Sequence, residues 1–167
     1  MIHGTSGEII KGLRYLCLVV FCLALVLETA GCSEEVASSD PPPEQGQPSL
    51  PIEQEIFDLI NAARADEGLL PLARNSTMDG LALQHSKDMY AAHLLSHDGF
   101  HTRANEIRSG LGASQVGENV AVGYSSAKAF VVGWLGSKGH RDNIMNSSYT
   151  RTGIGYFDGY ATQVFCD

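Results

Sequence analysis

Histidine is the residue type in this chain best suited to bind a metal or to transfer a proton near neutral pH. Five of its six histidines lie between residues 85 and 140. His93, His97 and His101 are four residues apart, a spacing that would align them on one face of a helix and suits a metal ion. The intervening Asp98-Gly99 pair favours a break, so we do not expect these three histidines to act together.

His85 belongs to a different pattern. It falls on the apolar face of a helix predicted after Ser76, at the same helical spacing as Ala82 and Met89. A histidine on such a face is usually a hydrogen-bonded residue of the core. We therefore place His85 outside the candidate site.

Common enzyme motifs are missing from the sequence. It contains no Gly-x-Ser-x-Gly elbow, no His-Glu-x-x-His, no phosphate-binding glycine loop and no Cys-x-x-Cys pair. With 11 basic and 19 acidic residues the net charge is −8, and no cluster of Lys or Arg occurs. Binding of nucleic acid through its phosphates is therefore not expected.

Three short clusters remain as candidates for chemistry. They are Leu-Ser-His-Asp at 95–98, Gly-Glu-Asn at 117–119 and Gly-His-Arg-Asp-Asn-Ile at 139–144. An Asn-Ala-Ala-Arg segment precedes them at 61–64, and Trp134 and a Gly-Ile-Gly-Tyr segment at 153–156 also fall in order. With these motifs the chain resembles the CAP (SCP-like) superfamily of cysteine-rich secretory and plant pathogenesis-related proteins, and most closely its bacterial branch without disulfides. The resemblance extends from residue 52 to residue 165.

This resemblance implies an α+β fold, an α–β–α sandwich in which a small, mainly antiparallel sheet lies between helical layers. It also implies a surface cleft with two histidines and two acids. His97 and His140 match the two histidines, and Glu118 matches one acid. The second acid normally lies three residues after the tryptophan that matches Trp134, where this chain has Ser137. Three of the four cleft residues are therefore present, and the paired carboxylates are not.

The chemistry of this trio follows from its side chains. A carboxylate within about 4–6 Å of two imidazoles favours their charged forms, while two imidazoliums disfavour each other, so the group should titrate as a unit near neutral pH. With zinc or another divalent metal, His97 and His140 would be ligands. Glu118 would then be a third ligand, or the candidate catalytic base beside a bound water.

Three functions remain open. The first, which we favour, is a binding module, because members of the family that the chain resembles bind sterols, lipids or other proteins. Its ligand would be a small hydrophobic molecule, a glycan or a partner protein. The second is a metal-dependent, peptidase-like hydrolase. The third is a purely structural envelope protein without a small ligand. The cleft could also be only a scaffold, with function in loops such as residues 102–116. In that case Glu118 would accept backbone hydrogen bonds, Asn119 would fix a turn, and Arg141 would form a surface ion pair.

Apolar periodicity predicts the elements that position these residues. Helices are predicted to begin at Pro51, after Ser76 and after Ser125 or Ser126. A short apolar strand is predicted at 120–122. Strands at 152–157 and 160–166 flank an Asp-Gly pair, which is typical of a tight β-hairpin. We assign residues 51–167 to the domain.

Residues 1–31 are typical of a lipoprotein signal peptide. Lys11 and Arg14 precede an apolar run of 13 residues at 15–27, shorter than the about 20 residues that span a bilayer. Small residues then precede Cys32, as in the bacterial lipobox, where the cysteine is acylated. We expect export and anchoring in the bacterial cell envelope through lipid on Cys32, with secretion as a soluble protein as the alternative.

Residues 32–50 are predicted to form a disordered tether. They are rich in Ser, Glu, Gln and Pro, with four acidic residues and no basic residue. Cys17 and Cys22 would leave with the signal peptide, and Cys32 would carry lipid. Only Cys166 then remains in the domain, where we expect it to be a small buried hydrophobe.

Overall fold

The computed structural model describes residues 51–167. The predicted signal peptide, the tether and Cys32 lie outside the described residues. Within the described part, no helix is both long and apolar enough to cross a membrane. The elements follow in the order α1 (Ile52–Asp66), β1 (Ala73–Arg74), α2 (Ser76–Ala92), α3 (Phe100–Leu111), β2 (Val116–Val122), α4 (Ala127–Gly136), α5 (Lys138–Ile144), β3 (Arg151–Phe157) and β4 (Tyr160–Cys166).

The strands form one sheet in the order β1-β3-β4-β2. β2 runs antiparallel to β4, with Val116 opposite Cys166 and Val122 opposite Tyr160. β3 is antiparallel to β4, and the two-residue β1 is parallel to β3. β2 is therefore an edge strand of the sheet.

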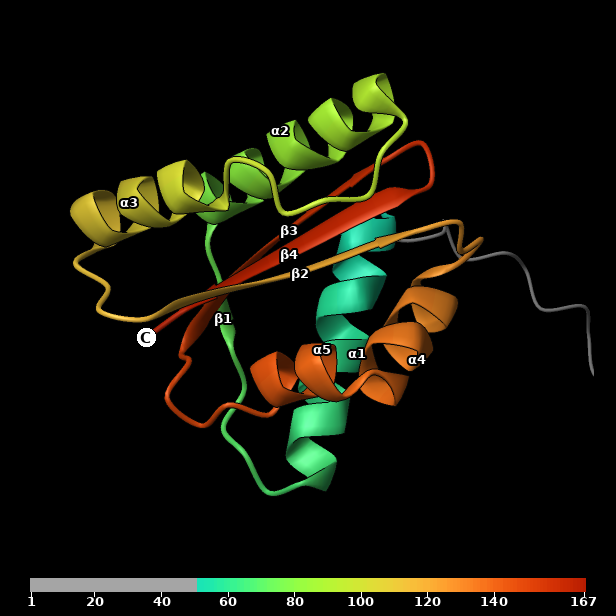
Figure 1. Ribbon diagram of the computed structural model, residues 1–167. Helices are drawn as coiled ribbons and strands as arrows, with labels where there is room; N and C mark the ends of the chain where they lie inside the picture. Colours follow the sequence, from blue (N-terminus) through green and yellow to red (C-terminus); the bar gives the residue numbers. More distant parts are fainter. Residues whose placement is uncertain (1–50) are drawn as a thin grey trace, which may run out of the picture. The chain divides into compact units, whose positions relative to one another are not determined.

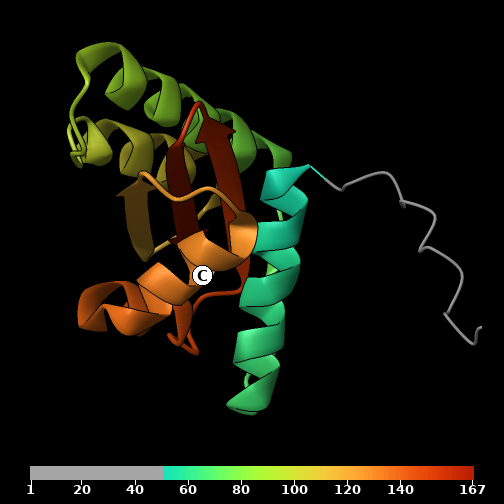
Figure 2. The same ribbon diagram turned by 90° about the vertical axis from the view of Figure 1, so that its right-hand side faces the viewer.

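Helices cover both faces of this sheet, so the predicted α–β–α sandwich is confirmed (Figures 1 and 2). α2 and α3 lie on one face, and α1, α4 and α5 lie on the other. α2 lies directly against β3, because a Cβ on Gly153 would be 2.2 Å from the backbone carbon of Met78. A Cβ on Gly155 would be 2.1 Å from the backbone nitrogen of Leu83. These two glycines allow the close approach of helix and sheet.

The predicted helices and hairpin are all present. α1 begins directly after Pro51, and α4 begins after Ser126, whose hydroxyl accepts a hydrogen bond from the backbone of Ala129 at 3.2 Å. The cap of α2 is Asn75. In the hairpin turn, Asp158 has a φ of 43° and Gly159 a φ of 87°, as the Asp-Gly pair indicated.

The prediction of a loop at 102–116 is wrong, because most of this segment forms α3. The helix begins after Gly99 and ends before Gly112, both with positive φ. Few apolar side chains mark it in the sequence, and Ala104 and Ile107 are its buried ones. Two further elements differ from the predicted ones: β2 begins at Val116 rather than at residue 120, and α5 is a helix that the apolar periodicity did not predict.

The Asn-Ala-Ala-Arg segment of α1 stabilises the neighbouring loops. Asn61 bonds through its side-chain amide to the backbone N–H of Leu72 at 2.8 Å and to its carbonyl at 3.1 Å. Arg64 is 1% exposed and donates to backbone carbonyls only, among them those of Leu70 and Ile144. Burial lowers the pKa of this guanidinium from its ordinary value. The two side chains therefore connect α1 to the segment that precedes β1 and to the end of α5.

Candidate functional site

Glu118 lies in the middle of β2 and points toward the layer of α2 and α3. Its side chain is 1% exposed, so its charge needs a partner within the protein. Arg103 of α3 supplies that partner with two bonds: Nε donates to Oε2 at 2.8 Å, and Nη2 donates to Oε1 at 2.9 Å. The donors to Glu118 are side chains. A purely structural role of Glu118 predicted backbone donors instead. Sequence reasoning missed Arg103, because it lies in the helix that was predicted as a loop.

His97 lies in the loop between α2 and α3, which returns along β2 (Figure 1). Its Nδ1 is 2.8 Å from Glu118 Oε1, so two residues of the predicted trio meet. A carboxylate can only accept, and Nδ1 therefore carries the proton in this contact. The side chain is 53% exposed. Its second nitrogen, Nε2, is free to act as an acceptor when the ring is neutral.

His85 is buried in α2, and its ring is hydrogen-bonded to the backbone carbonyl of Ser96 at 2.9 Å. This confirms the expected hydrogen-bonded core histidine. The structure adds a contact that the sequence did not suggest, because Nε2 also lies 3.9 Å from Glu118 Oε1. Burial lowers the pKa of His85, and the charge of Arg103 lowers it further, against the raising effect of the Ser96 hydrogen bond. His85 thus belongs to the electrostatic surroundings of Glu118.

His140 is positioned from the opposite face of the sheet. The side-chain amide of Asn119 donates to the His140 carbonyl at 3.1 Å, and Asn143 donates to the Glu118 carbonyl at 3.1 Å and to Asn119 Oδ1 at 2.9 Å. These bonds hold α5 against the outer edge of β2. The pKa of the His140 imidazole is lowered by burial and by the charge of His97. The Gly-Glu-Asn and Gly-His-Arg-Asp-Asn-Ile clusters therefore dock against each other.

A groove of about 210 Å³ runs along the second half of β2, and we call it the β2 groove. Val120 and Val122 of β2, Trp134 of α4 and His140 of α5 are among the residues that line it. Ser137, at the position of the missing acid, lines it as well. Its lining residues are Leu95, Val120, Ala121, Val122, Tyr124, Gly133, Trp134, Ser137 and His140. The groove thus has an apolar wall, with the imidazole of His140 and the hydroxyl of Ser137 among its polar groups.

The described residues fit a metal ion poorly. Among residues 51–167, no group of three or more His, Cys, Asp or Glu side chains is placed to hold one. Both oxygens of Glu118 are occupied by Arg103, and Oε1 also by His97. These contacts compete with the use of Glu118 as a third ligand or as a base beside a metal-bound water. His97 and His140 remain as two nitrogen donors, fewer than the three protein ligands of a typical catalytic zinc site.

The remaining histidines of the four-residue series lie apart from this site. His93 directly follows α2, with a φ of 51°, and His101 lies in the first turn of α3. His93 and His97 therefore lie in the loop between α2 and α3 and His101 lies in α3, so the three do not share one helical face. Arg141 forms the expected surface ion pair, 2.7 Å from Glu67.

The lone cysteine of the domain has no exposed thiol. Cys166 is buried and free, with its sulfur 3.7 Å from that of Met78, as predicted for a small hydrophobe. Burial raises the pKa of the thiol, which keeps it protonated. Cys166 is therefore a packing residue.

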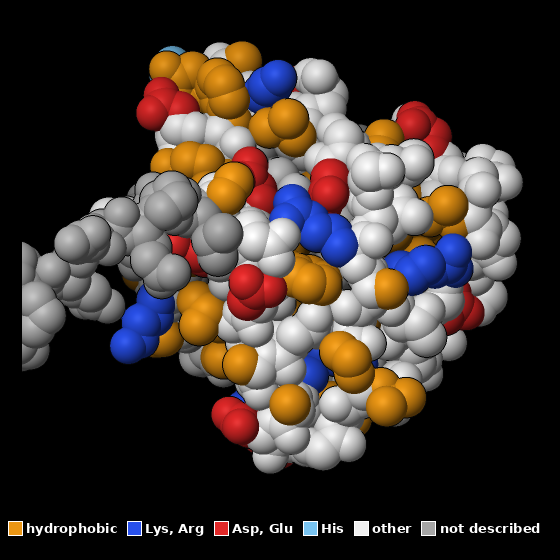
Figure 3. Space-filling model, turned by 180° about the vertical axis from the view of Figure 1, so that it is seen from behind, with side chains coloured by type: hydrophobic (Ala, Val, Ile, Leu, Met, Phe, Trp, Pro, Cys, Tyr) orange, Lys and Arg blue, Asp and Glu red, His pale blue; other side chains and the backbone are white. Residues whose placement is uncertain are grey.

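On the face of the molecule seen from behind, charged side chains of both signs are scattered rather than clustered (Figure 3). Figure 3 shows separate Lys and Arg side chains between acidic ones on the face seen from behind. No continuous basic band is visible on this face. The arrangement agrees with the acidic composition of the whole chain.

The sandwich, the edge strand and the histidine beside its buried glutamate define a class of small α–β–α domains, and comparison with known families identifies it. The model of the Cysteine-rich secretory protein family, CAP, matches residues 57–166. This match covers more than half of the chain. The chain belongs to the CAP family, as the motifs indicated.

Similar proteins come from bacteria. The chain is 36% identical over 116 residues to the uncharacterized membrane protein YlbC, and 32% identical over 109 residues to the uncharacterized protein YkwD, both of Bacillus subtilis (strain 168). These alignments cover 68% and 64% of this chain but only 34% and 42% of the two relatives.

A crystal structure of an extracellular protein containing a SCP domain, from Bacillus anthracis, has the same fold, with a TM-score of 0.64 and 34% identity. It is matched over 72% of this chain and 45% of its own length. The chain therefore spans less than half the length of each of these three proteins.

Proposed function

We propose that this protein is an exported, lipid-anchored bacterial binding module, and that its CAP domain takes up a ligand in the β2 groove. The β2 groove is the observation that carries this proposal. Three of its lining side chains, Leu95, Val122 and Tyr124, are 38% to 44% exposed although they are apolar. An apolar wall with a few polar groups at one end is the usual composition of a ligand site. A small hydrophobic molecule, a glycan or an apolar segment of a partner protein would be its occupant.

His97 and Glu118 support binding by preorganisation. The carboxylate of Glu118 fixes the ring of His97 through Nδ1, and the two bonds from Arg103 fix the carboxylate in turn. A side chain that is already held in place loses little entropy when a ligand binds to it. His140 lines the β2 groove, and His97, which does not line it, lies close enough for its charge to lower the pKa of His140. Both imidazoles would then offer a nitrogen to polar groups of the ligand.

Two observations favour binding over peptidase-like hydrolysis: the burial of Glu118 and the absence of a carboxylate at position 137. The proposed base, Glu118, is buried and engaged by Arg103. Ser137 supplies no second carboxylate beside His140. A hydrolytic mechanism would need a carboxylate free to accept a proton from water.

The proposed location rests on the N-terminal segment and on the relatives. YlbC is named as a membrane protein, and the Bacillus anthracis structure is named as that of an extracellular protein. Cys32 would carry the lipid, and residues 32–50 would separate the domain from the bilayer.

The groove can be tested with anilinonaphthalene sulfonate, a fluorescent apolar probe. Val122→Asp places a negative charge at the rim, where Val122 is 38% exposed, and this charge repels the sulfonate of the probe. Val132→Asp is the matched control, because Val132 is 61% exposed on α4 and does not line the groove. We expect the fluorescence enhancement of the full chain to fall strongly in the first variant and to persist in the second. Equal enhancement in both variants would contradict the proposal.

Anchoring is tested separately by Cys32→Ser. Membrane fractionation and intact mass spectrometry of cells that express the chain should find the parent protein acylated and membrane-bound. The variant should be unacylated and released. Equal release of both proteins would exclude the lipid anchor.

A further inference from the structure

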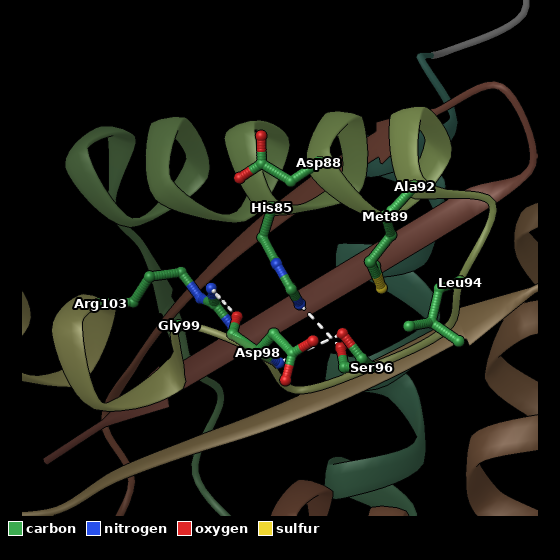
Figure 4. A pocket seen from close by; sticks show the side chains of 9 residues that line it. All are labelled: His85, Asp88, Met89, Ala92, Leu94, Ser96, Asp98, Gly99 and Arg103. Atoms are coloured by element: carbon green, nitrogen blue, oxygen red, sulfur yellow. Dashed lines mark hydrogen bonds between the residues drawn. The ribbon is translucent and has the colours of Figure 1, made fainter.

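Two further cavities lie on the other side of the loop that carries His97. They measure about 340 Å³ and 300 Å³ and lie between α2, this loop and the beginning of α3. His85, Asp88, Gly99 and Arg103 line both, so they adjoin, and we call them together the rear hollow. Figure 4 shows the larger one. None of its lining residues lines the β2 groove, so a ligand of the rear hollow would bind at a site separate from the β2 groove.

The free charge around the rear hollow is negative. Asp88 lies on α2 above it and Asp98 on the loop below it (Figure 4). Glu106 of α3 lines the smaller cavity. The one fixed cation in the lining is Arg103, whose guanidinium is neutralised by the two bonds to Glu118. The rear hollow therefore favours a cationic occupant.

The buried ring of His85 adds a hydrogen-bond acceptor to this lining. The Ser96 carbonyl can only accept, so Nε2 of His85 carries the proton and Nδ1 of the neutral ring is an acceptor. The His85 side chain is 3% exposed, and Nδ1 has no hydrogen-bond partner among the described residues. Within the same part of the chain, Gln163 Oε1 is the one side-chain polar atom that is both fully enclosed and unpartnered. Nδ1 is therefore not fully enclosed, and it belongs to a side chain that lines both cavities of the rear hollow.

Burial supports the same protonation state. It lowers the pKa of His85, which favours the neutral ring near neutral pH. A neutral imidazole accepts one hydrogen bond at Nδ1 and does not repel a cation.

The rest of the lining is apolar. Met89, Ala92 and Leu94 line the larger cavity, and Leu81 lines the smaller one. Their surface suits the methylene groups of an aliphatic chain. A divalent metal is a poorer match, because residues 51–167 contain no three acidic, histidine or cysteine groups close enough to coordinate one. An ammonium tolerates longer contacts, about 2.8 Å rather than about 2.1 Å.

We propose that the rear hollow binds a primary ammonium group at the end of a short aliphatic chain, as in a lysine side chain or an alkyl diamine. Two N–H donors of the ammonium would meet the carboxylate of Asp98 and Nδ1 of His85. The carboxylate of Asp88 points away from the loop in Figure 4, and a rotation of this exposed side chain would bring it to the third N–H. The aliphatic chain would lie along Met89 and Leu94.

The proposal is tested with protonated pentylamine as the probe and pentanol as its uncharged analogue. Amide and ring shifts of the full chain would be followed by NMR as each compound is added. We expect saturable shifts of His85 and of residues in α2 and the loop with pentylamine, and much weaker ones with pentanol. Equal shifts with both compounds, or none with pentylamine, would overturn the proposal.

Substitutions of two exposed residues then test whether the carboxylates of Asp88 and Asp98 bind the ammonium. Asp88→Asn and Asp98→Asn should each weaken pentylamine binding about fivefold, as expected for a partly exposed ion pair. Asp58→Asn is the matched control: Gln54 bonds to Asp58 at 2.8 Å on α1 just as Gln84 bonds to Asp88 at 2.8 Å on α2. This control should leave binding unchanged. A loss of equal size in Asp58→Asn would mean that only the net charge acts, and the proposed site would be wrong.

Discussion

Arg103 and Glu118 form a buried ion pair with two hydrogen bonds, Nε to Oε2 at 2.8 Å and Nη2 to Oε1 at 2.9 Å. Arg103 also donates to the carbonyl of Asp98 at 2.8 Å, and Glu118 holds His97. One arginine therefore joins α3, the loop that carries His97 and the edge strand β2. The position of His97 depends on a side chain that none of the family motifs includes.

Arg103→Met should destabilise the fold by about 3–5 kcal/mol, because it leaves the Glu118 carboxylate buried without its charge partner. Urea unfolding followed by circular dichroism measures the change. Arg108→Met on the exposed side of the same helix is the control, and it should change stability by no more than about 0.5 kcal/mol. Similar stability of the two variants would show that the ion pair does not hold this part of the fold.

Stability should decrease as the pH falls below about 6.5, the ordinary pKa of histidine. Burial lowers the pKa values of His85 and His140, so the unfolded chain takes up protons at a higher pH than the folded chain. Their contribution is complete above the unfolded pKa and is lost as the pH falls through the window down to the lowered pKa values. NMR titration of the ring protons and urea unfolding across this window check the prediction. Midpoints above about 6.5 for both rings would contradict it.

Ser137→Glu should raise the affinity of the domain for zinc, because Ser137 and His140 both line the β2 groove. The new carboxylate would supply the acid that the family places at this position, and its charge would raise the pKa of His140. Calorimetric titration of zinc measures the affinity. Gly136→Glu adds the same charge at the neighbouring exposed residue and should bind zinc no better than the parent. The gain should also disappear when His140→Ala is combined with Ser137→Glu, and persistence of the gain would disprove the site.

Gly155→Ala should destabilise the protein strongly, because its Cβ would lie 2.1 Å from the backbone nitrogen of Leu83 and force α2 away from β3. Gly139→Ala provides the comparison, since a Cβ there has no neighbour within 4 Å and the residue lies in α5. That second change should be neutral or should stabilise by roughly 0.5–1 kcal/mol. Thermal unfolding separates the two cases. An unchanged melting temperature in Gly155→Ala would show that the close contact is not required.

The amino-acid sequence alone was sufficient for the elements with strong local signals. Ile56 and Ile60 mark α1, Phe130 and Trp134 mark α4, and the Asp158-Gly159 pair marks the hairpin, because each pattern acts through neighbours along the chain. The ordered motifs around His97, Glu118 and His140 also identified the family. The helix α3 was not predicted from the sequence, because it is stabilised by packing on β2 and carries few apolar residues of its own.

Only the tertiary structure decided which side chains meet. Successive residues of a strand point to opposite faces, so Glu118 reaches Arg103 and His85 on one side while Asn119 binds the carbonyl of His140 on the other. No local pattern reveals that pairing, because it depends on how helices from distant parts of the chain stack on the sheet. The same stacking removes Glu118 from solvent and leaves the edge of β2 to form the groove.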